Sequence, residues 1–465
     1  MRVVQGLMIM LLAAHPILAQ PSSPVVLSLQ VATNMTLRSS DALRIRELEG
    51  EAAEERYRSG IRDYLPQLQI GFTTSGTVNV AAPDSGCDEL SVTVQQPIYN
   101  GGRTTKQRAL ARLQIQLSRH AYRAARADLL ASAWDQFYQV LVLEAQLDVK
   151  RRYLAQSRAQ LGIARTERSL GMIREVDLVD TELQATNQEI DLRSTERELV
   201  SARYTLKRTL GLSPDQELAL TETIDTGYDG IDIDSPPSVL LPIAESQNLD
   251  LQTARFTVSQ AEVQASLAKS RYLPQVSASL TLSVSGRGLP LQTPGMSLGF
   301  TVAFPESEAP ARISLSRGVA FRQSTTENAS FAINPFQSIT GFLDEADARL
   351  ELEAARSAAA ALRKDIAFQI AQGIAGYQRQ QQTTRLERRS IELERRKLEI
   401  MRQEVESGAA TRVDYVKEEA IAAALEAQLL ERVLTLLRNE RALERLLGLD
   451  PGELPRAVGE VHESQ

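Results

Sequence analysis

The feature of this sequence that most constrains its fold is an internal duplication. A Tyr-Leu-Pro-Gln segment and a later proline recur 208 residues apart, at 64–67 and 272–275 and at Pro97 and Pro305. Three further features recur 237 residues apart, at Gly171 and Gly408, at Asp177 and Asp414, and in the Leu-Gly-Leu-x-Pro segments 210–214 and 447–451. Two constant offsets indicate one unit written twice, with about 29 extra residues in the second copy. We therefore expect two repeats of one fold, at 20–238 and 239–452.

Membrane strands are predicted after each Tyr-Leu-Pro-Gln segment, because apolar and polar residues alternate strictly there. The first copy has this pattern within 67–98 and the second within 275–305. The polar positions carry uncharged Ser, Thr and Gln, and each run approaches the ~9–11 residues that a strand of a membrane barrel needs. The alternative is the half-buried sheet of a soluble sandwich.

Long helical hairpins are predicted after the strands. An opening helical stretch in each copy (31–62 and 241–270) ends before Tyr-Leu-Pro, since proline disfavours helix at the residue before it. The hairpins cover 103–210, turning at Gly171, and 343–447, turning at Gly408. At 1.5 Å per residue, the first helix of each hairpin would be about 100 Å long. A coiled-coil seam with 4-3 spacing is expected in the last helix, at Val416, Ala420, Ala423, Ala427, Leu430, Leu434 and Leu437.

The extra residues of the second copy predict an additional β-hairpin at 311–336, because Ile313, Leu315 and Val319 share one parity, as do Ala329, Phe331 and Ile333. Two placements are open. The hairpin would either raise the barrel strands from four to six per chain, or form a flap outside the membrane. A count of the barrel strands in a structure separates the two.

The chain ends and the composition narrow the function. Arg2, the short apolar run after it and Ala19 predict an export signal at 1–19, since the run is shorter than the ~20 residues of a spanning helix. A flexible tail is expected at 453–465. The net charge of −7 is interspersed, which disfavours a nucleic-acid partner. One cysteine and three histidines offer no metal or thiol site, and no catalytic set is apparent, so we expect neither a cofactor nor an enzyme.

Four membrane strands cannot close a barrel, and an open sheet edge cannot face lipid. The chain is therefore expected to recruit copies of itself. Three copies would give about twelve strands, within the range of known barrels. The helical hairpins would continue that barrel as a tube, which is the form of a conduit. The fold class predicted is mainly α, with coiled-coil hairpins and a shared transmembrane β-barrel.

The chain resembles the TolC family of outer-membrane efflux proteins (the outer membrane factors) over nearly its whole mature length. The motifs that carry the resemblance, in order and twice, are Tyr-Leu-Pro-Gln, the segment 96–103, the glycine tips before Val176-Asp177 and Val413-Asp414, and Leu-Gly-Leu-x-Pro. The resemblance implies a homotrimer in outer-membrane lipid, with most of the chain in the periplasm. It also implies docking to a periplasmic adaptor (membrane fusion) protein and an inner-membrane transporter, for drug efflux or type I secretion. The rival is a soluble periplasmic coiled-coil adaptor or scaffold, and the exported substrate cannot be read from the sequence.

The resemblance also implies a gate at the periplasmic end, at the positions Asp177 and Asp414. A ring of aspartates on a three-fold axis would attract cations and raise the pKa of these carboxyls. The family's second acidic position is Lys417 here, so an Asp414–Lys417 contact or pairing across subunits is an alternative way to close the gate. Arg174 and Arg412 are further latch candidates. Solvated charges at helix starts are the plainer interpretation of all five.

The turns of the two hairpins are the expected contacts for the adaptor. The residues in question are Leu170, Gly171, Met172, Gly408 and Ala409. The glycines have a second reason to be there, since a helix end often needs glycine for its turn geometry. A partner captured by crosslinking at Gly171 or Gly408 would be the most informative observation.

Overall fold

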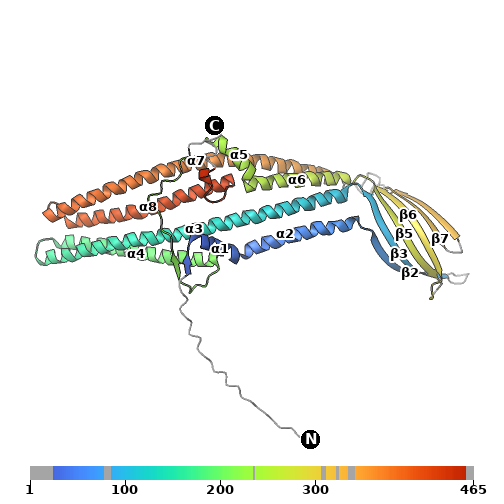
Figure 1. Cartoon of the computed structure of the whole chain (residues 1–465), viewed down its shortest axis with the longest axis horizontal. Helices are drawn as coiled ribbons and strands as arrows, with labels where there is room; N and C mark the ends of the chain where they lie inside the picture. The colour runs from blue at the N-terminus through green and yellow to red at the C-terminus, as the bar shows by residue number, and fades with distance from the viewer. Residues whose placement is uncertain are drawn as a thin grey trace, which may run out of the picture. The chain divides into compact units, whose positions relative to one another are not determined.

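The computed structural model describes residues 25–77, 85–233, 236–287, 289–304, 311–320, 324–333 and 341–456. The export signal predicted at 1–19 and the tail residues 457–465 lie outside the described residues. The elements in the first copy are β1 (Val25–Leu27), α1 (Leu29–Ser39), α2 (Asp41–Ser59), the 3-10 turn Gly60–Tyr64, β2 (Gln67–Thr77), β3 (Ser85–Asn100), α3 (Arg103–Ser169), α4 (Glu175–Leu210) and β4 (Leu218–Leu220). Those in the second are α5 (Pro237–Gln247), α6 (Leu249–Ser270), β5 (Gln275–Gly286), β6 (Thr293–Phe304), β7 (Ala311–Ala320), β8 (Ser324–Ile333), α7 (Gly341–Ser407) and α8 (Arg412–Leu447) (Figure 1).

The chain divides into two compact units, and each is built from both repeats. The first unit comprises Met1–Ser40, Leu129–Asp229 and Gln382–Leu436, and it contains both hairpin tips. The second comprises Asp41–Asp128, Gly230–Gln381 and Leu437–Gln465, and it contains the large sheet.

The first unit has an apolar core between α3 and α4. Phe137 and Leu141 of α3 pack there with Leu199 and Leu206 of α4, as the helical spacing of these apolar residues favours. Ion pairs at seven-residue intervals flank this core, joining Arg151 to Glu196, Arg158 to Glu189 and Arg165 to Glu182. Seven residues are two turns of a coiled coil, so the pairs follow one edge of an antiparallel hairpin.

The second unit carries one antiparallel sheet with the strand order β2-β3-β5-β6-β7-β8. The pair of β3 with β5 joins the two repeats. The additional hairpin continues the sheet, because β7 pairs with β6 from Phe304↔Ala311 to Gly295↔Ala320 and β8 pairs with β7. A flap apart from the sheet is therefore not what the chain forms. The count of four strands per chain, on which the sum of twelve rested, is corrected to six in this sheet.

The opening helical stretch of each copy differs from the prediction, because it is two helices with a break between them. The breaks fall at Ser40, between α1 and α2, and at Asn248, between α5 and α6. At the second break, the Asn248 side chain accepts a hydrogen bond from the Leu251 backbone and donates one to the Leu446 carbonyl oxygen. Asparagine at this position caps the new helix and so ends the old one.

A glycine after each long hairpin lies against the break in the opening stretch. A Cβ on Gly211 would lie 2.7 Å from the Ser39 Cβ, and one on Gly448 would lie 2.4 Å from the Gln247 carbonyl carbon. These glycines follow α4 and α8 with φ of 70° and 77°, which is the left-handed conformation that favours glycine. The end of each long hairpin thus touches the break in its own opening stretch.

Two smaller features were not predicted. β1 and β4 form a parallel pair of three residues each, which is too short to leave an alternation pattern in the sequence. The expected tail begins later than 453, because residues 454–456 form a helical turn and Leu454 is fully buried. A Glu444 carboxylate oxygen accepts hydrogen bonds from the backbone N–H groups of Gly452 and Leu454, which fixes this turn.

Candidate functional site

The large sheet exposes its apolar face. Ile70 of β2 is 69% exposed and Phe331 of β8 is 65% exposed. The other large exposed side chains of this face are Leu68, Phe72, Leu90, Leu280, Leu282, Met296, Leu298, Phe300, Ile313, Leu315, Val319 and Ile333. A soluble protein rarely exposes an apolar patch of this extent unless another phase or partner covers it. In the soluble-sandwich alternative the apolar face would be buried, whereas in this sheet that face is exposed.

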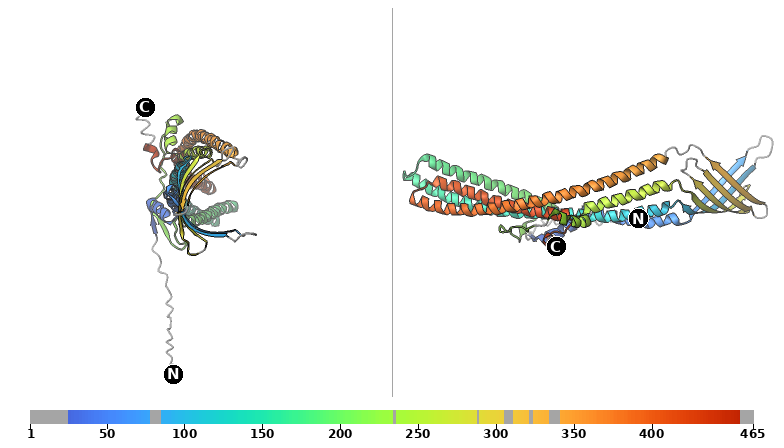
Figure 2. Two further views of the ribbon diagram at one scale, coloured as in Figure 1. Left: turned by 90° about the vertical axis from the view of Figure 1, so that its right-hand side faces the viewer. Right: turned by 90° about the horizontal axis from the view of Figure 1, so that it is seen from above.

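The opposite face is polar, made of small residues, and less exposed. Along β6, Ser297 and Thr301 are half-buried and Gly299 is buried, whereas their apolar neighbours are exposed. Side chains crowd together on this face: the Thr93 and Thr281 hydroxyls lie 2.9 Å apart, and a Cβ on Gly299 would lie 2.7 Å from the Ser279 Oγ. The end view in Figure 2 shows the strands as a curved layer. Crowding on the polar side identifies it as the concave one, as in a barrel with a wet interior.

The tip of the first hairpin is an apolar turn. Gly171 has φ of 75°, and the Met172 N–H donates to the Glu167 carbonyl oxygen, which is the bond pattern of a glycine-ended helix. Leu170 and Met172 are predominantly exposed, Met172 at 71%. These predicted contact residues are thus available to a partner.

Asp177 and Arg174 lie together at the start of α4. Arg174 donates to the Asp177 carboxylate from Nε (3.0 Å), Nη2 (2.8 Å) and its backbone N–H (3.3 Å). The hydrogen bond from the Arg174 side chain lowers the pKa of the Asp177 carboxyl. This direction is opposite to the one expected for an aspartate ring, because within a chain the carboxylate already has a cationic partner.

The tip of the second hairpin has the same turn but smaller side chains. Gly408 has φ of 76°, and the Ala409 N–H donates to the Glu404 carbonyl oxygen. Asp414 accepts a hydrogen bond from the Thr411 hydroxyl (2.5 Å), and Thr411 in turn accepts one from the Asp414 N–H (3.2 Å). This reciprocal pair is a helix cap. Asp414 therefore contacts Thr411 and not Lys417, which lies exposed.

Arg412 joins the second hairpin to the first. Its guanidinium donates two hydrogen bonds to the Glu167 carboxylate (2.5 and 3.2 Å) and one to the Gln160 side-chain oxygen (2.5 Å). The Arg412 side chain is only 17% exposed. The interpretation of Arg412 as a plain solvated charge is therefore wrong, because a paired carboxylate of α3 covers it. Such bidentate pairs fix geometry as well as charge.

Further contacts between α3 and α8 continue this connection away from the tips, and the sequence did not reveal them. The Tyr153 hydroxyl donates to Glu426 (2.9 Å), which also accepts from Arg395 Nε (2.9 Å). Gln146 donates to the Ala427 carbonyl oxygen (3.0 Å). We call these contacts, together with Arg412–Glu167, the α3–α8 seam. Leu430 and Leu434, expected in the coiled-coil seam, pack in it against Val142 and Val149 of α3.

Glu419 is buried in α8, two turns from the tip region. It is 1% exposed and hydrogen-bonded to Tyr415, and one of its carboxylate oxygens has no hydrogen-bond partner among the described residues. Burial raises the pKa of Glu419 to about 7. The sequence did not single out this residue. Its 4-3 spacing with Ala422 and Glu426 was the signal, since a second buried stripe runs beside the predicted one.

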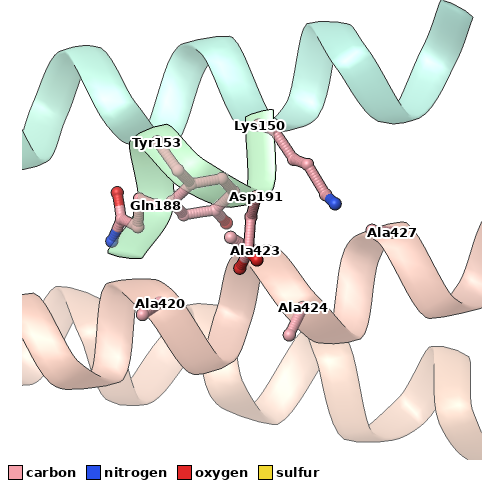
Figure 3. A pocket seen from close by; sticks show the side chains of 8 residues that line it. All are labelled: Lys150, Tyr153, Gln188, Asp191, Ala420, Ala423, Ala424 and Ala427. Carbon is pink, nitrogen blue, oxygen red and sulfur yellow. The ribbon is translucent and has the colours of Figure 1, made fainter. Parts of the chain in front are cut away.

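A pocket of about 250 Å³ lies beside the seam (Figure 3). α3 contributes Lys150 and Tyr153, α4 contributes Gln188 and Asp191, and the α8 wall consists of alanines at 420, 423, 424 and 427. Lys150 is held by a hydrogen bond from its Nζ to the Thr195 hydroxyl (2.8 Å). Alanine side chains end at Cβ, and they therefore leave this space open between α8 and the facing helices. The small side chains account for the pocket without any ligand.

The described part of the chain has neither a membrane-spanning helix nor a metal-binding cluster. None of its helices has the length and apolar character needed to cross a membrane. None of its His, Cys, Asp and Glu side chains gather in a group that would hold a metal ion.

Comparison with known proteins agrees with the geometry of the sheet and the hairpins. A model of the outer membrane efflux protein family matches the chain twice, over residues 32–212 and 240–449. Each match covers one repeat, from its opening helices to the end of its long hairpin. The chain belongs to the outer membrane efflux protein family. The TolC-family resemblance and the predicted fold class are confirmed.

Membership of the outer membrane efflux protein family locates the chain in the outer membrane, with its helical part in the periplasm. It also makes the protein an efflux channel, and the family's members are channels and not enzymes. No curated protein sequence matches the chain.

Solved structures of outer-membrane channels share the fold at low identity. CusC matches with a TM-score of 0.74 and 16% identity over 91% of this chain and 92% of its own. VceC from Vibrio cholerae matches with a TM-score of 0.71 and 15% identity over 90% and 96%. MtrE from Neisseria gonorrhoeae, in its open state, matches with a TM-score of 0.68 and 16% identity over 90% and 89%.

Proposed function

We propose that this efflux channel works as a homotrimer whose sheets close into one barrel in the outer membrane. The exposed apolar face of the six-stranded sheet carries the proposal, because lipid is the partner that covers such a face. The sheet leaves β2 and β8 as edges, and backbone groups at an edge have no partner in lipid. Copies of the same chain supply that partner.

The helical hairpins then form the periplasmic conduit, and their tips dock a periplasmic adaptor protein that brings an inner-membrane transporter. The first tip is the stronger candidate for an apolar contact, because Leu170, Met172 and Val176 are exposed there. The second tip offers Gly408 and Ala409, which leave room for a partner to approach its backbone closely. The channel exports what the transporter delivers to it.

The gate is formed by α8, and the α3–α8 seam sets its position. Arg412 holds the start of α8 to Glu167 of α3. Opening the tip therefore requires either that this ion pair breaks or that α3 and α8 move together. Asp414 and Lys417 face neighbouring copies and close the opening between them. Arg174 and Asp177 keep the first tip rigid while α8 moves.

Membrane fractionation and the mass of the detergent-extracted protein test this function directly. The protein is expected in the outer-membrane fraction, to require detergent for extraction, and to have the mass of three chains plus detergent. Cysteine in place of Met172 is expected to crosslink to an adaptor, with cysteine at the exposed α4 position Glu198 as the control. A monomer recovered only from the soluble periplasm would contradict the proposal.

A further inference from the structure

We propose that the hairpin β7–β8 supplies the edge between subunits, so that β8 of one copy pairs with β2 of the next and three copies close a barrel of eighteen strands. This inference rests on the trimeric channel proposed above. It concerns a surface of the chain, the β8 edge, and its partner is the β2 edge of a second copy.

Strand direction is the first argument. Neighbouring strands of the sheet are antiparallel throughout, so the first and last of six strands run in opposite directions. β8 of one copy therefore meets β2 of the next in the antiparallel arrangement that every other pair already has. One added strand would have forced a parallel junction. A hairpin is the smallest insertion that keeps an antiparallel barrel closed.

The two edges also match in length and in face. β2 has 11 residues and β8 has 10. On the apolar face, Ile70 and Phe72 of β2 correspond to Phe331 and Ile333 of β8, and all four side chains are exposed. A register that keeps the apolar sides together continues the apolar face from β8 of one copy to β2 of the next, whereas a slip of one residue reverses it. Within the hairpin, this face also carries the Arg317–Glu327 ion pair (3.4 Å).

β6 is not available for this role. It pairs with β5 from Gln275↔Ala303 to Ser285↔Thr293, and with β7 on its other side from Gly295 to Phe304. Both of its edges are therefore occupied over most of its length. A closure through β6 would have to strip β7 from the sheet and lose ten residues of pairing.

The polar face of the added hairpin suits a lumen. Ser314 and Ser316 of β7, with Thr326, Asn328 and Ser330 of β8, continue the mostly uncharged polar side chains of the first four strands. Glu89 of β3 and Arg312 of β7 are charged positions on the same face. The diameter of a barrel grows roughly in proportion to its strand number, so eighteen strands give about 1.5 times the diameter of twelve. The membrane part would then admit bulkier solutes than a twelve-stranded barrel of the same build.

Disulfide crosslinking in the outer membrane tests which strand is the edge. In a Cys87→Ser background, single cysteines are placed on the polar face of β2 (Gln69→Cys or Thr73→Cys) together with one on β8 (Asn328→Cys or Ser330→Cys). The matched control keeps the β2 cysteine and moves the second one to β6 (Ser297→Cys or Thr301→Cys). Covalent dimers and trimers are expected for β2–β8 pairs and not for β2–β6 pairs. A variant lacking residues 311–333 is expected to gain the β2–β6 crosslink.

The outcomes separate this inference from the function on which it rests. A β2–β6 crosslink in the full-length chain would overturn the inference and leave the trimeric channel standing. A trimeric mass without a β2–β8 crosslink in any of the four pairs would also overturn it. A monomeric mass without any crosslink would overturn both. If the shortened variant does not assemble, the comparison within the full-length chain still decides.

Discussion

The two copies of the hairpin place the same residue in different surroundings. Glu182 of α4 and Glu419 of α8 occupy equivalent positions, 237 residues apart. The Glu182 side chain is 53% exposed and pairs with Arg165, whereas Glu419 is buried. Glu189 and Glu426, seven residues further along, show the same contrast. α8 packs against its hairpin partner α7 and also against α3 through the α3–α8 seam, whereas this edge of α4 faces water. The burial of the α8 glutamates therefore depends on this additional helix, α3, and not on the local sequence.

The helices and the strands of the two copies have also diverged unequally. α3 and α7 both have 67 residues, and α4 and α8 both have 36. The strand part, in contrast, grew from β2 and β3 in the first copy to β5–β8 in the second. Antiparallel hairpins that share a core must keep matched lengths, whereas a sheet edge can be extended by a further hairpin.

The largest effect is expected where the two copies are alike. Leu206 and Leu443 are equivalent and both are buried, so each change to alanine removes a packed side chain and is expected to cost about 3–4 kcal/mol. Thermal unfolding of Leu206→Ala and Leu443→Ala measures the loss. Similar losses would show that the cores remain equivalent, and a loss below about 1 kcal/mol in one variant would show that its copy has relaxed.

The next effect separates the copies by pH. The pKa of Glu419 is raised in the folded chain to about 7, so its contribution to stability is present below its unfolded pKa and is lost as pH rises through 7. Glu419→Gln does not ionise, and it is expected to stabilise the protein by up to ~3 kcal/mol at pH 8, while the gain disappears near pH 4.5. Denaturant unfolding at the two pH values measures this.

Glu182→Gln is the matched control for Glu419→Gln. It removes an exposed ion pair with Arg165, which is worth less than about 1 kcal/mol, and no gain at pH 8 is expected. The contrast between the copies fails if both glutamine variants respond to pH in the same way.

A smaller effect is expected at the link between the hairpins. Arg412→Ala removes the bidentate pair with Glu167 and is expected to destabilise the tip by about 1–3 kcal/mol. In a planar bilayer, the variant is expected to open more often than the wild type. Its equivalent in the first copy is Glu175, which pairs with Arg168 at the surface, so Glu175→Ala is expected to leave the open time unchanged. Equal open times for Arg412→Ala and the wild type would argue against a latch.

The smallest effect concerns the helix starts. Arg174→Ala and Thr411→Ala each remove the partner of the N3 aspartate at equivalent positions. Thr411→Ala is expected to cost about 1 kcal/mol as a lost cap, and Arg174→Ala less, because its ion pair is solvated. Hydrogen exchange of the first turn of α4 and α8 measures both. A larger effect for Arg174→Ala would reverse the order.

The sequence predicts the elements that repeat a period and misses those that depend on a third partner. Alternation located β5 to β8, and helical spacing located both hairpins. The breaks at Ser40 and Asn248 were missed, because the glycine that contacts each break lies about 170 to 200 residues away in the chain. The same division holds near the hairpin tips. The motifs located Gly171 and Gly408 at the turns and the two aspartates at the helix starts, whereas the partner of Arg412 depends on α3 packing beside α8.

The contacts of Gly211 and Gly448 have a consequence for how the copies diverged. The nearest atoms that an added Cβ would meet are the Ser39 Cβ at Gly211 and the Gln247 backbone at Gly448, which nearly every residue would supply, so two different residues can occupy this position. Substitutions around the joint can accumulate freely, while a substitution of either glycine meets a collision. Both copies therefore keep the same backbone geometry at this joint although the residues that meet the glycines differ.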